Sequence, residues 1–500
     1  METIDGLLLG FQTILNPTAL MFCFIGVFLG TFVGVLPGIG ALAAISLLLP
    51  VTFHLPTVPA LMMLAGVYNG SQYGGSIAAI LLNIPGTPQS VVTSLDGNPL
   101  AKQGRPGVAL FVSMFASFWG ALLGILLLVL AAPTIAEWGV KLGPPEYFSI
   151  MLLGLVAACS MAGADIIKGL AMVVLGLLLG TVGADLVTGV TRFDFGVSEL
   201  YDGINLIPLA LGIFGLTEVM KTINIDLKGN TAPRLTLKTM LPTRGEIKRC
   251  VMPIFRGSSF GGIFGALPGA GGSLSTFISY AVERKVSKHP ERFGQGAVEG
   301  IAAPESSNNA AAVTSFIPTL TMGIPGDVVM ALMLGAMIIH GIQPGPLLIT
   351  QQPALFWGLI VSFIIGNFML LVLNGPLVGM WVKLLRIPFS ILYPAILIFI
   401  SLGAYSVNGN VFDIYATAMI GVLGYALSLT RFSPAPLLLG FVLGPMLEEN
   451  FRTAMLYSRG DLAIFTDSWV SLIILTCTAL FLLKAVFSGL RKSATKAVNA

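Results

Sequence analysis

Two acidic residues, Glu305 and Asp327, stand in apolar parts of the chain where few other carboxylates occur. An ionisable side chain inside a membrane is costly and usually functional. Each residue is therefore a candidate to carry a coupling proton or to bind Na⁺. Helix capping is the alternative role, for Glu305 at an interface and for Asp327 directly after Pro-Gly.

The sequence contains two related sets of polar residues, and both acids belong to the second set. Residues 69–76 read Asn-Gly-Ser-Gln-Tyr-Gly-Gly-Ser, and Asn-Ile-Pro-Gly-Thr follows at 83–87. Residues 304–309 read Pro-Glu-Ser-Ser-Asn-Asn, and Gly-Ile-Pro-Gly-Asp follows at 323–327. We expect each polar stretch to belong to a helix break, with its amides and hydroxyls completing the shell of a bound ligand.

A Leu-Pro-Gly-x-Gly motif also occurs twice, within residues 34–40 and 265–271. Pro and Gly both disfavour an uninterrupted helix. In lipid, broken backbone is tolerated only where protein buries it or water lines it. Corresponding breaks in two halves of a chain are typical of the binding site of a secondary transporter.

The chemistry of such breaks favours an anion. Unpaired amide N–H groups at the start of a half-helix carry partial positive charge and suit a carboxylate, and unwound carbonyl groups suit a cation such as Na⁺. Close helix packing is the alternative for the small residues. The candidate substrate-binding residues are Pro37, Gly38, Gly40, Ser71, Gln72, Tyr73, Gly74, Gly75, Ser76, Asn83, Pro85, Gly86, Thr87, Pro268, Gly269, Gly271, Ser273, Ser306, Asn308, Asn309, Pro325 and Gly326.

The composition indicates the elements that position these residues. The 500-residue chain is 55% hydrophobic and only 10% charged, whereas soluble domains carry about 25% charged residues. Apolar runs of roughly 20 residues recur along its length, which predicts an all-α polytopic integral membrane protein in a lipid bilayer. Motifs for zinc hydrolysis, ATP binding and serine hydrolysis are absent from the sequence, so we expect no enzyme activity, cofactor or nucleic-acid partner.

The motifs belong to a longer internal repeat. Residues 69–87 align with 309–327, and residues 34–40 align with 265–271. We therefore divide the chain into a first membrane half at 1–220 and a second at 250–500. The polar linker at 221–249 carries an excess of Lys and Arg, which places it and the basic C-terminus in the cytoplasm.

Charges in the loops predict how the two repeats are related. The basic loop at 283–292 corresponds to 50–56, which has no Lys or Arg, and the basic loop at 97–106 corresponds to 340–350, which also has none. Because Lys and Arg change sides between the halves, we expect inverted-topology repeats with broken or re-entrant helices. A parallel duplication with random loop charge is the alternative.

The motifs together resemble the large membrane subunit of the tripartite tricarboxylate transporters, the TctA family, over nearly the whole chain. They are Gly34-Val-Leu-Pro-Gly-Ile-Gly40, Tyr73-Gly-Gly-Ser-Ile77, Leu82-Asn-Ile-Pro-Gly-Thr-Pro88, Pro304-Glu-Ser-Ser-Asn-Asn-Ala310, Ile317-Pro-Thr-Leu-Thr-Met-Gly-Ile-Pro-Gly326, Gly341-Ile-Gln-Pro-Gly-Pro346 and Gly444-Pro-Met-Leu-Glu-Glu-Asn-Phe-Arg452.

This resemblance implies a multi-pass protein of the bacterial inner membrane. It implies a small membrane subunit (TctB-like) and a periplasmic solute-binding protein (TctC-like) as partners. It also implies uptake of organic di- or tricarboxylates by symport with Na⁺ or H⁺. A passive anion channel, or a permease that works without a binding protein, is the alternative. A channel needs a continuous polar pore, whereas the polar residues here gather at a few breaks.

Overall fold

The computed structural model describes residues 3–36, 39–159, 166–185, 188–222, 237–269, 271–385 and 389–498. Helices dominate this part of the chain, and a two-residue antiparallel pair forms its strands, as expected for an all-α protein. Pro37 and Gly38, two of the candidate site residues, lie outside the described residues, as do residues 223–236 of the basic linker.

The first half begins with helices whose starts match local sequence signals. Asn16 caps the second helix by accepting the N–H of Thr18 at 3.0 Å, and Pro17 follows at the first helical position, where its missing N–H costs nothing. The helices are α1 (Thr3–Ile14), α2 (Pro17–Val35), α3 (Gly40–Thr52), α4 (Thr57–Leu82), α5 (Ser90–Lys102) and α6 (Pro106–Gly139).

The second half has a matching order of helices. Its first long helix starts with a capping box, in which Thr243 and Glu246 satisfy each other's backbone N–H groups. The helices are α12 (Arg244–Gly265), α13 (Gly271–Val286), α14 (Val298–Thr314), α15 (Phe316–Met322), α16 (Val328–Ile339), α17 (Leu348–Gln351) and α18 (Pro353–Asn374).

The repeated motifs adopt the same backbone conformation in both halves. Gly40 and Gly271 each have φ of +65°, and Asn83 and Gly323 have φ of +58° and +69°. These left-handed residues end or begin helices that would otherwise run on. The resulting helices α3, α5, α13 and α16 have 12 to 16 residues, fewer than the roughly 20 that cross a bilayer.

Rows of glycine join the helices within each half. In α2, Gly26, Gly30 and Gly34 lie against the backbone of α4 so closely that an added Cβ would come within 2.1–2.5 Å of a carbonyl oxygen. In α12, Gly257, Gly261 and Gly265 lie against α14 in the same way. These rows have the small-xxx-small spacing that lets membrane helices approach closely. We did not predict them, although the spacing is visible in the sequence.

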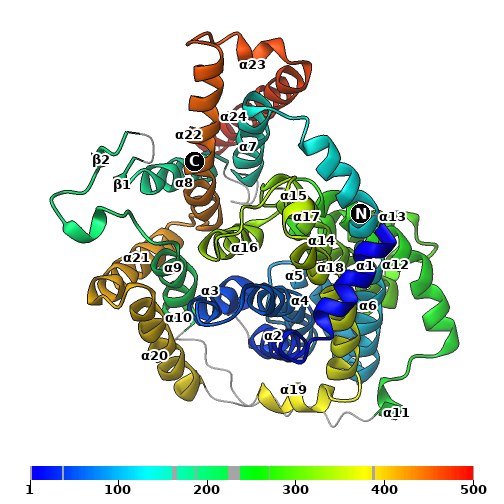
Figure 1. The fold of residues 1–500 in the computed structure, drawn as a ribbon. Helices are drawn as coiled ribbons and strands as arrows, with labels where there is room; N and C mark the ends of the chain where they lie inside the picture. Colours follow the sequence, from blue (N-terminus) through cyan, green and yellow to red (C-terminus); the bar gives the residue numbers. More distant parts are fainter. Residues whose placement is uncertain are drawn as a thin grey trace.

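The two halves also pack against each other in a matching way. The long helix α6 of the first half lies along α14, where Gly120 contacts the backbone of Ser306. Its counterpart α18 lies along α4, where Gly358 contacts Met62. Figure 1 shows α3, α4, α5, α14 and α16 near the middle of the molecule.

The remaining elements surround this centre. Helices α7, α8, α22 and α24 form a group at the top of Figure 1. Helices α20 and α21 lie at the lower left of the same view. Their bounds are α7 (Pro144–Ala158), α8 (Ile166–Gly180), β1 (Gly183–Ala184), β2 (Thr191–Arg192), η2 (Ser198–Leu200), α9 (Leu206–Ala210), η3 (Leu211–Leu216), α10 (Thr217–Thr222), α11 (Leu237–Met240), η4 (Pro290–Arg292), α19 (Val378–Leu384), α20 (Phe389–Asn408), α21 (Val411–Leu429), α22 (Ala435–Tyr457), α23 (Ile464–Asp467) and α24 (Trp469–Val498).

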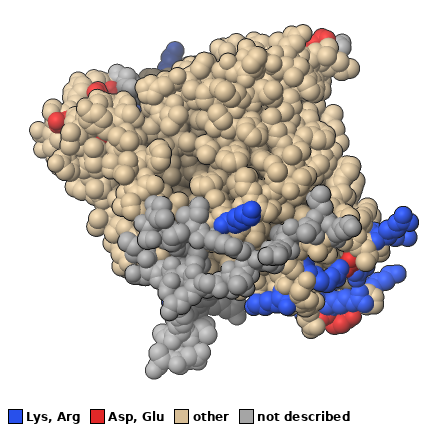
Figure 2. All heavy atoms as spheres, turned by 90° about the horizontal axis from the view of Figure 1, so that it is seen from below, with Lys and Arg blue, Asp and Glu red and all other residues tan. Residues whose placement is uncertain are grey.

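The outer surface is that of a multi-pass membrane protein. Within the described residues, four helices are long and apolar enough to cross a membrane: α2, α6, α18 and α21. Large apolar side chains such as Leu130, Phe255 and Phe399 are 60–63% exposed. Figure 2 shows a broad surface without charged side chains and a cluster of Lys and Arg at one end.

The basic loops of the two halves adjoin one another. Gln103 donates to the carbonyl of Gln295 at 2.7 Å, and Arg105 pairs with Glu246 at 2.8 Å. Burial raises the pKa of Glu246, but hydrogen bonds from Thr243 and from the Arg105 guanidinium outweigh burial and hold that pKa below its usual value. Residues 103–105, which connect α5 to α6, and residues 287–297 therefore lie on one face with the start of α12.

The opposite face is reached by the long helices. Helix α6 has 34 residues, which corresponds to about 50 Å from Arg105 to Gly139. Gly139 contacts Pro346 at the far end, within the loop at 340–350. Helix α4 ends near Asn98, which donates to the carbonyl of Ile80 at 3.0 Å, so its other end and the loop at 50–56 lie about 35 Å away.

Candidate functional site

The helix breaks of the first half contact each other. Gly86 packs on the carbonyl of Gly34, where an added Cβ would lie 2.2 Å from the oxygen, and a Cβ on Gly40 would come within 3.5 Å of the oxygen of Gly86. Gly75 of α4 borders the same place and faces Thr87. Pro85 lies between these contacts and is partly buried.

The breaks of the second half contact each other through a backbone hydrogen bond. The N–H of Gly269 donates to the carbonyl of Gly326 at 3.0 Å. Gly326 packs on Ser315, and Gly269 has φ of +75° with α7 directly beside it. Pro325 and Gly271 are buried here, whereas Pro268 is only partly buried.

The two halves meet where α5 and α13 begin. A Cβ added to Gly272 would lie 3.4 Å from Cγ of Gln89 and 3.5 Å from Oδ1 of Asn308. The first break of the second half therefore adjoins the second break of the first half. Ser273 follows and is partly buried. The structure thus brings the described parts of the four breaks into one connected region.

Glu305 is fully buried between the two halves, at 0% exposure. Its carboxyl group accepts hydrogen bonds from the hydroxyls of Ser76 at 2.6 Å, Ser117 at 2.9 Å and Thr93. These donors come from α4, α6 and α5 of the first half, while Glu305 belongs to α14. Because it lies well inside α14, Glu305 does not cap a helix.

Asp327 does cap a helix, and it also joins the halves. Its Oδ1 accepts the N–H of Met330 at 2.9 Å at the start of α16. Its Oδ2 accepts the hydroxyl of Tyr68, from α4. Asp327 is 5% exposed, so capping and a buried interaction between the repeats coexist at this residue.

The two polar stretches differ from our expectation, because they are helical and not broken. Residues 69–76 lie within α4 and residues 304–309 lie within α14. The hydroxyls of Ser71 and Ser306 donate to backbone carbonyls of the same helix, those of Tyr68 and Ala303. Such bonds satisfy polar side chains without unwinding a helix, so only the Ile-Pro-Gly ends are breaks.

Other candidate residues have contacts that serve packing or helix ends. Gly74 lies against the carbonyl of Thr31, where an added Cβ would be at 2.3 Å. Tyr73 donates its hydroxyl to Oδ1 of Asn367 in α18 at 2.7 Å. Asn83 is exposed and ends α4 in the left-handed conformation. These contacts favour close packing for Gly74 and a backbone role for Asn83.

Several buried polar atoms in this region have no hydrogen-bond partner among the described residues. They are Oε1 of Gln72, Oγ1 of Thr87, Oγ of Ser307 and Nδ2 of Asn308. Asn309, by contrast, donates to the carbonyl of Glu305 at 3.0 Å. Buried polar groups are nearly always paired in native proteins, and each exception calls for an explanation such as a missing ligand or water.

A small cavity of about 10 Å³ lies between α4, α6 and the end of α18. It is lined by Tyr73, Ser113 and Asn374, among others. Oδ1 of Asn374 has no partner within the described chain. The space is about that of one water molecule. In the part of the chain that the structure describes, no three His, Cys, Asp or Glu side chains lie close enough together to hold a metal ion.

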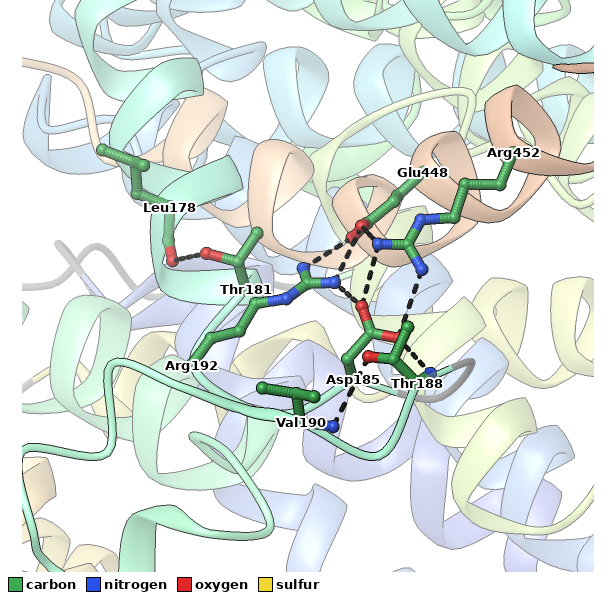
Figure 3. Close-up of polar contacts among 8 residues, drawn as sticks. All are labelled: Leu178, Thr181, Asp185, Thr188, Val190, Arg192, Glu448 and Arg452. Carbon is green, nitrogen blue, oxygen red and sulfur yellow. Dashed lines mark hydrogen bonds and ion pairs between the residues drawn. The ribbon is translucent and has the colours of Figure 1, made fainter. Parts of the chain in front are cut away.

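A separate ion network joins the β1–β2 hairpin to α22 (Figure 3). Arg192 pairs with both oxygens of Glu448, at 3.0 and 3.1 Å, and with Asp185. Arg452 pairs with both oxygens of Asp185, at 2.9 and 3.2 Å, and with Glu448. The acidic and basic residues near 448–452 thus hold together two segments that are distant in the sequence.

Comparisons with known proteins agree with these features. Residues 20–439 match the model of a family described as "Tripartite tricarboxylate transporter TctA family". An uncharacterized 52.8 kDa protein in the TAR-I ttuC' 3' region of Agrobacterium vitis is 49% identical over 492 residues, which is 98% of each chain. An uncharacterized protein in the TAR-II ttuC' 3' region of the same organism is 55% identical over 232 residues, 46% of this chain and 96% of that protein. No solved structure matches.

Proposed function

Because the chain belongs to the tripartite tricarboxylate transporter TctA family, we propose that it is the large membrane subunit of a secondary transporter that imports organic di- or tricarboxylates. It works in the bacterial inner membrane with a TctB-like small membrane subunit and a TctC-like periplasmic solute-binding protein. The energy comes from symport of Na⁺ or H⁺.

One observation carries this proposal: the described parts of the helix breaks of the two halves form one connected region, and Glu305 and Asp327 lie beside it. Helix starts at α3, α5, α13 and α16 bring backbone N–H groups to this region, where a carboxylate is favoured. The contacts of Gly40, Gly86, Gly269 and Gly272 connect these starts. A site of this kind, at the interface of two repeats, is typical of secondary transporters.

An inverted relation between the repeats is the second part of the proposal. Loops 97–106 and 340–350 occupy equivalent places in the repeat but lie at opposite ends of α6. Loops 283–292 and 50–56 are also equivalent, and the first adjoins the face of Gln103 whereas the second lies at the far end of α4. The basic loops face the cytoplasm by the positive-inside rule.

Glu305 is our proposed coupling residue. A buried carboxyl group held by three hydroxyls can gain and lose a proton, or bind Na⁺ together with the hydroxyl oxygens. Asp327 is the alternative carrier, because it is also a buried acid at a contact between the two halves.

Reconstitution tests the function. Vesicles that contain the two membrane subunits are given radiolabelled citrate or succinate, with and without the purified binding protein. We expect uptake only when the binding protein is present. Equal uptake without it would instead identify a permease or channel that works alone.

Topology is tested by labelling single cysteines in intact cells. Cysteines placed in 50–56 and 340–350 should react with an impermeant thiol reagent, while those in 97–106 and 283–292 should react only after lysis. Labelling of 50–56 and 283–292 from the same side would contradict the inverted repeat.

A further inference from the structure

Thr87 and Asp327 occupy equivalent positions in the two repeats, each directly after Ile-Pro-Gly. In the second repeat, the Asp327 carboxylate lies at the start of α16, where the N–H of Met330 and the hydroxyl of Tyr68 bind it. Helix α3 also packs against α16. The second repeat thus has a carboxyl group of its own at this helix start.

The equivalent place in the first repeat has no acid. Thr87 of the first repeat is equivalent to Asp327 of the second. Asn308 of the second repeat is equivalent to Tyr68 of the first, the residue that binds Asp327. The start of α5 has no side-chain cap. Asn is much shorter than Tyr, and Nδ2 of Asn308 and Oγ1 of Thr87 are both buried without a partner among the described residues.

The start of α13 lies beside the start of α5. Gly272 lies between Gln89, just before α5, and the Asn308 side chain. Its equivalent in the first repeat is Ala41, so this position is smaller by one methyl group. The starts of α5 and α13, the Asn308 side chain and Gly272 therefore meet at one point, and Thr87 stands three residues before the first residue of α5.

We propose that this point binds a carboxylate group of the substrate, in the position where the second repeat holds the carboxylate of Asp327. Asn308 donates through Nδ2 and Thr87 through its hydroxyl, and the starts of α5 and α13 add partial positive charge. This inference rests on the proposed function. Of the two equivalent sites, the one in the first repeat takes the substrate, because Asp327 already fills the one in the second repeat.

The test adds the missing acid to the first repeat. Thr87→Asp places a carboxylate where the substrate would bind, whereas Thr87→Asn has the same size without the charge. Uptake of labelled citrate and succinate is measured in cells that contain all three subunits. We expect Thr87→Asp to take up at least about tenfold less than Thr87→Asn, because two carboxylates repel each other at one site. Thermal unfolding should show Thr87→Asp at least as stable as Thr87→Asn.

A second variant does not depend on how well Thr87→Asp folds. Gly272→Ala meets its nearest atoms at 3.4–3.5 Å, an ordinary contact, so the protein should insert normally. The added methyl group narrows the site and makes this position the same as Ala41 in the first repeat. We expect the KM for the carboxylate to rise about threefold or more. Equal uptake by Thr87→Asp and Thr87→Asn, or an unchanged KM in Gly272→Ala, would overturn the site. Wild-type cells that take up no carboxylate would overturn the proposed function itself.

Discussion

Replacing Glu305 by Gln tests the coupling residue and also reports its protonation state. The carboxyl group accepts three hydroxyl hydrogen bonds and is fully buried. A hydrogen bond to a charged group contributes about 1.5–3 kcal/mol, and one between neutral groups about 0.5–1.5 kcal/mol. If Glu305 is ionised at rest, Glu305→Gln should lower the free energy of unfolding by roughly 3 kcal/mol, because each of the three hydrogen bonds weakens by about 1 kcal/mol. If Glu305 is protonated, Gln is nearly isosteric with it and should lower the free energy of unfolding by less than about 1 kcal/mol.

Transport by the same variant distinguishes the coupling ions. If Glu305 carries a proton, Glu305→Gln should still exchange labelled for unlabelled substrate but should lose accumulation driven by the gradient. If Glu305 binds Na⁺, the half-saturating Na⁺ concentration should rise, while capture of substrate by the periplasmic binding protein stays unchanged.

The matched control is Glu299→Gln, the same substitution on the same helix. Glu299 lies near the start of α14, where it pairs with Arg249 at 3.5 Å and is partly exposed. We expect this control to accumulate substrate like the wild type. Normal accumulation by Glu305→Gln, with unchanged ion dependence, would refute the reasoning and leave Glu305 a structural residue.

Three further predictions concern stability, each measured as unfolding of the purified protein. Gly261→Ala should destabilise it by about 1–3 kcal/mol, because the new Cβ would lie 2.1 Å from a backbone oxygen and the two helices must separate. Tyr68→Phe should cost about 1.5–3 kcal/mol, because the buried carboxylate of Asp327 loses a donor. The pKa of Glu246 is held below its usual value of 4.5, so the stabilisation from its pairing with Arg105 is present above that pH and is lost as the pH falls below it.

Each of these predictions has a control or a contradicting result. Gly245→Ala on the same helix α12 meets nothing within 4 Å and should leave stability unchanged. A Tyr68→Phe protein as stable as the wild type would show that the hydroxyl contributes nothing. Arg105→Gln should flatten the loss of stability between pH 6 and pH 3, and an unaltered profile would exclude the pairing as its cause.

The sequence predicted the breaks well because they depend on local backbone preference. Gly40 and Gly271 need a left-handed φ that glycine alone adopts at little cost, and both have it. The polar stretches were interpreted wrongly as part of the breaks. A run such as Ser-Ser-Asn-Asn looks unfavourable for a helix, but in a buried helix the hydroxyls bond carbonyls of the preceding turn.

The partners of the acids lay beyond what sequence patterns show. Thr93, Ser117 and Tyr68 are more than 180 residues from the acids that they contact. Nothing in their local sequence distinguishes them from other hydroxyl residues on apolar helices. The repeat alignment did contain one usable signal, because it pairs Thr87 with Asp327 and so shows an acid in one half only.

Transport against a gradient through the complete system is the most direct test of the proposed function. Vesicles with both membrane subunits and the binding protein are loaded with a defined Na⁺ or H⁺ gradient, and the internal concentration of labelled carboxylate is followed. We predict accumulation above the external concentration, which collapses when an ionophore removes the gradient. Equilibration to equal concentrations on both sides, unaffected by the gradient, would contradict a secondary transporter and identify a passive anion channel.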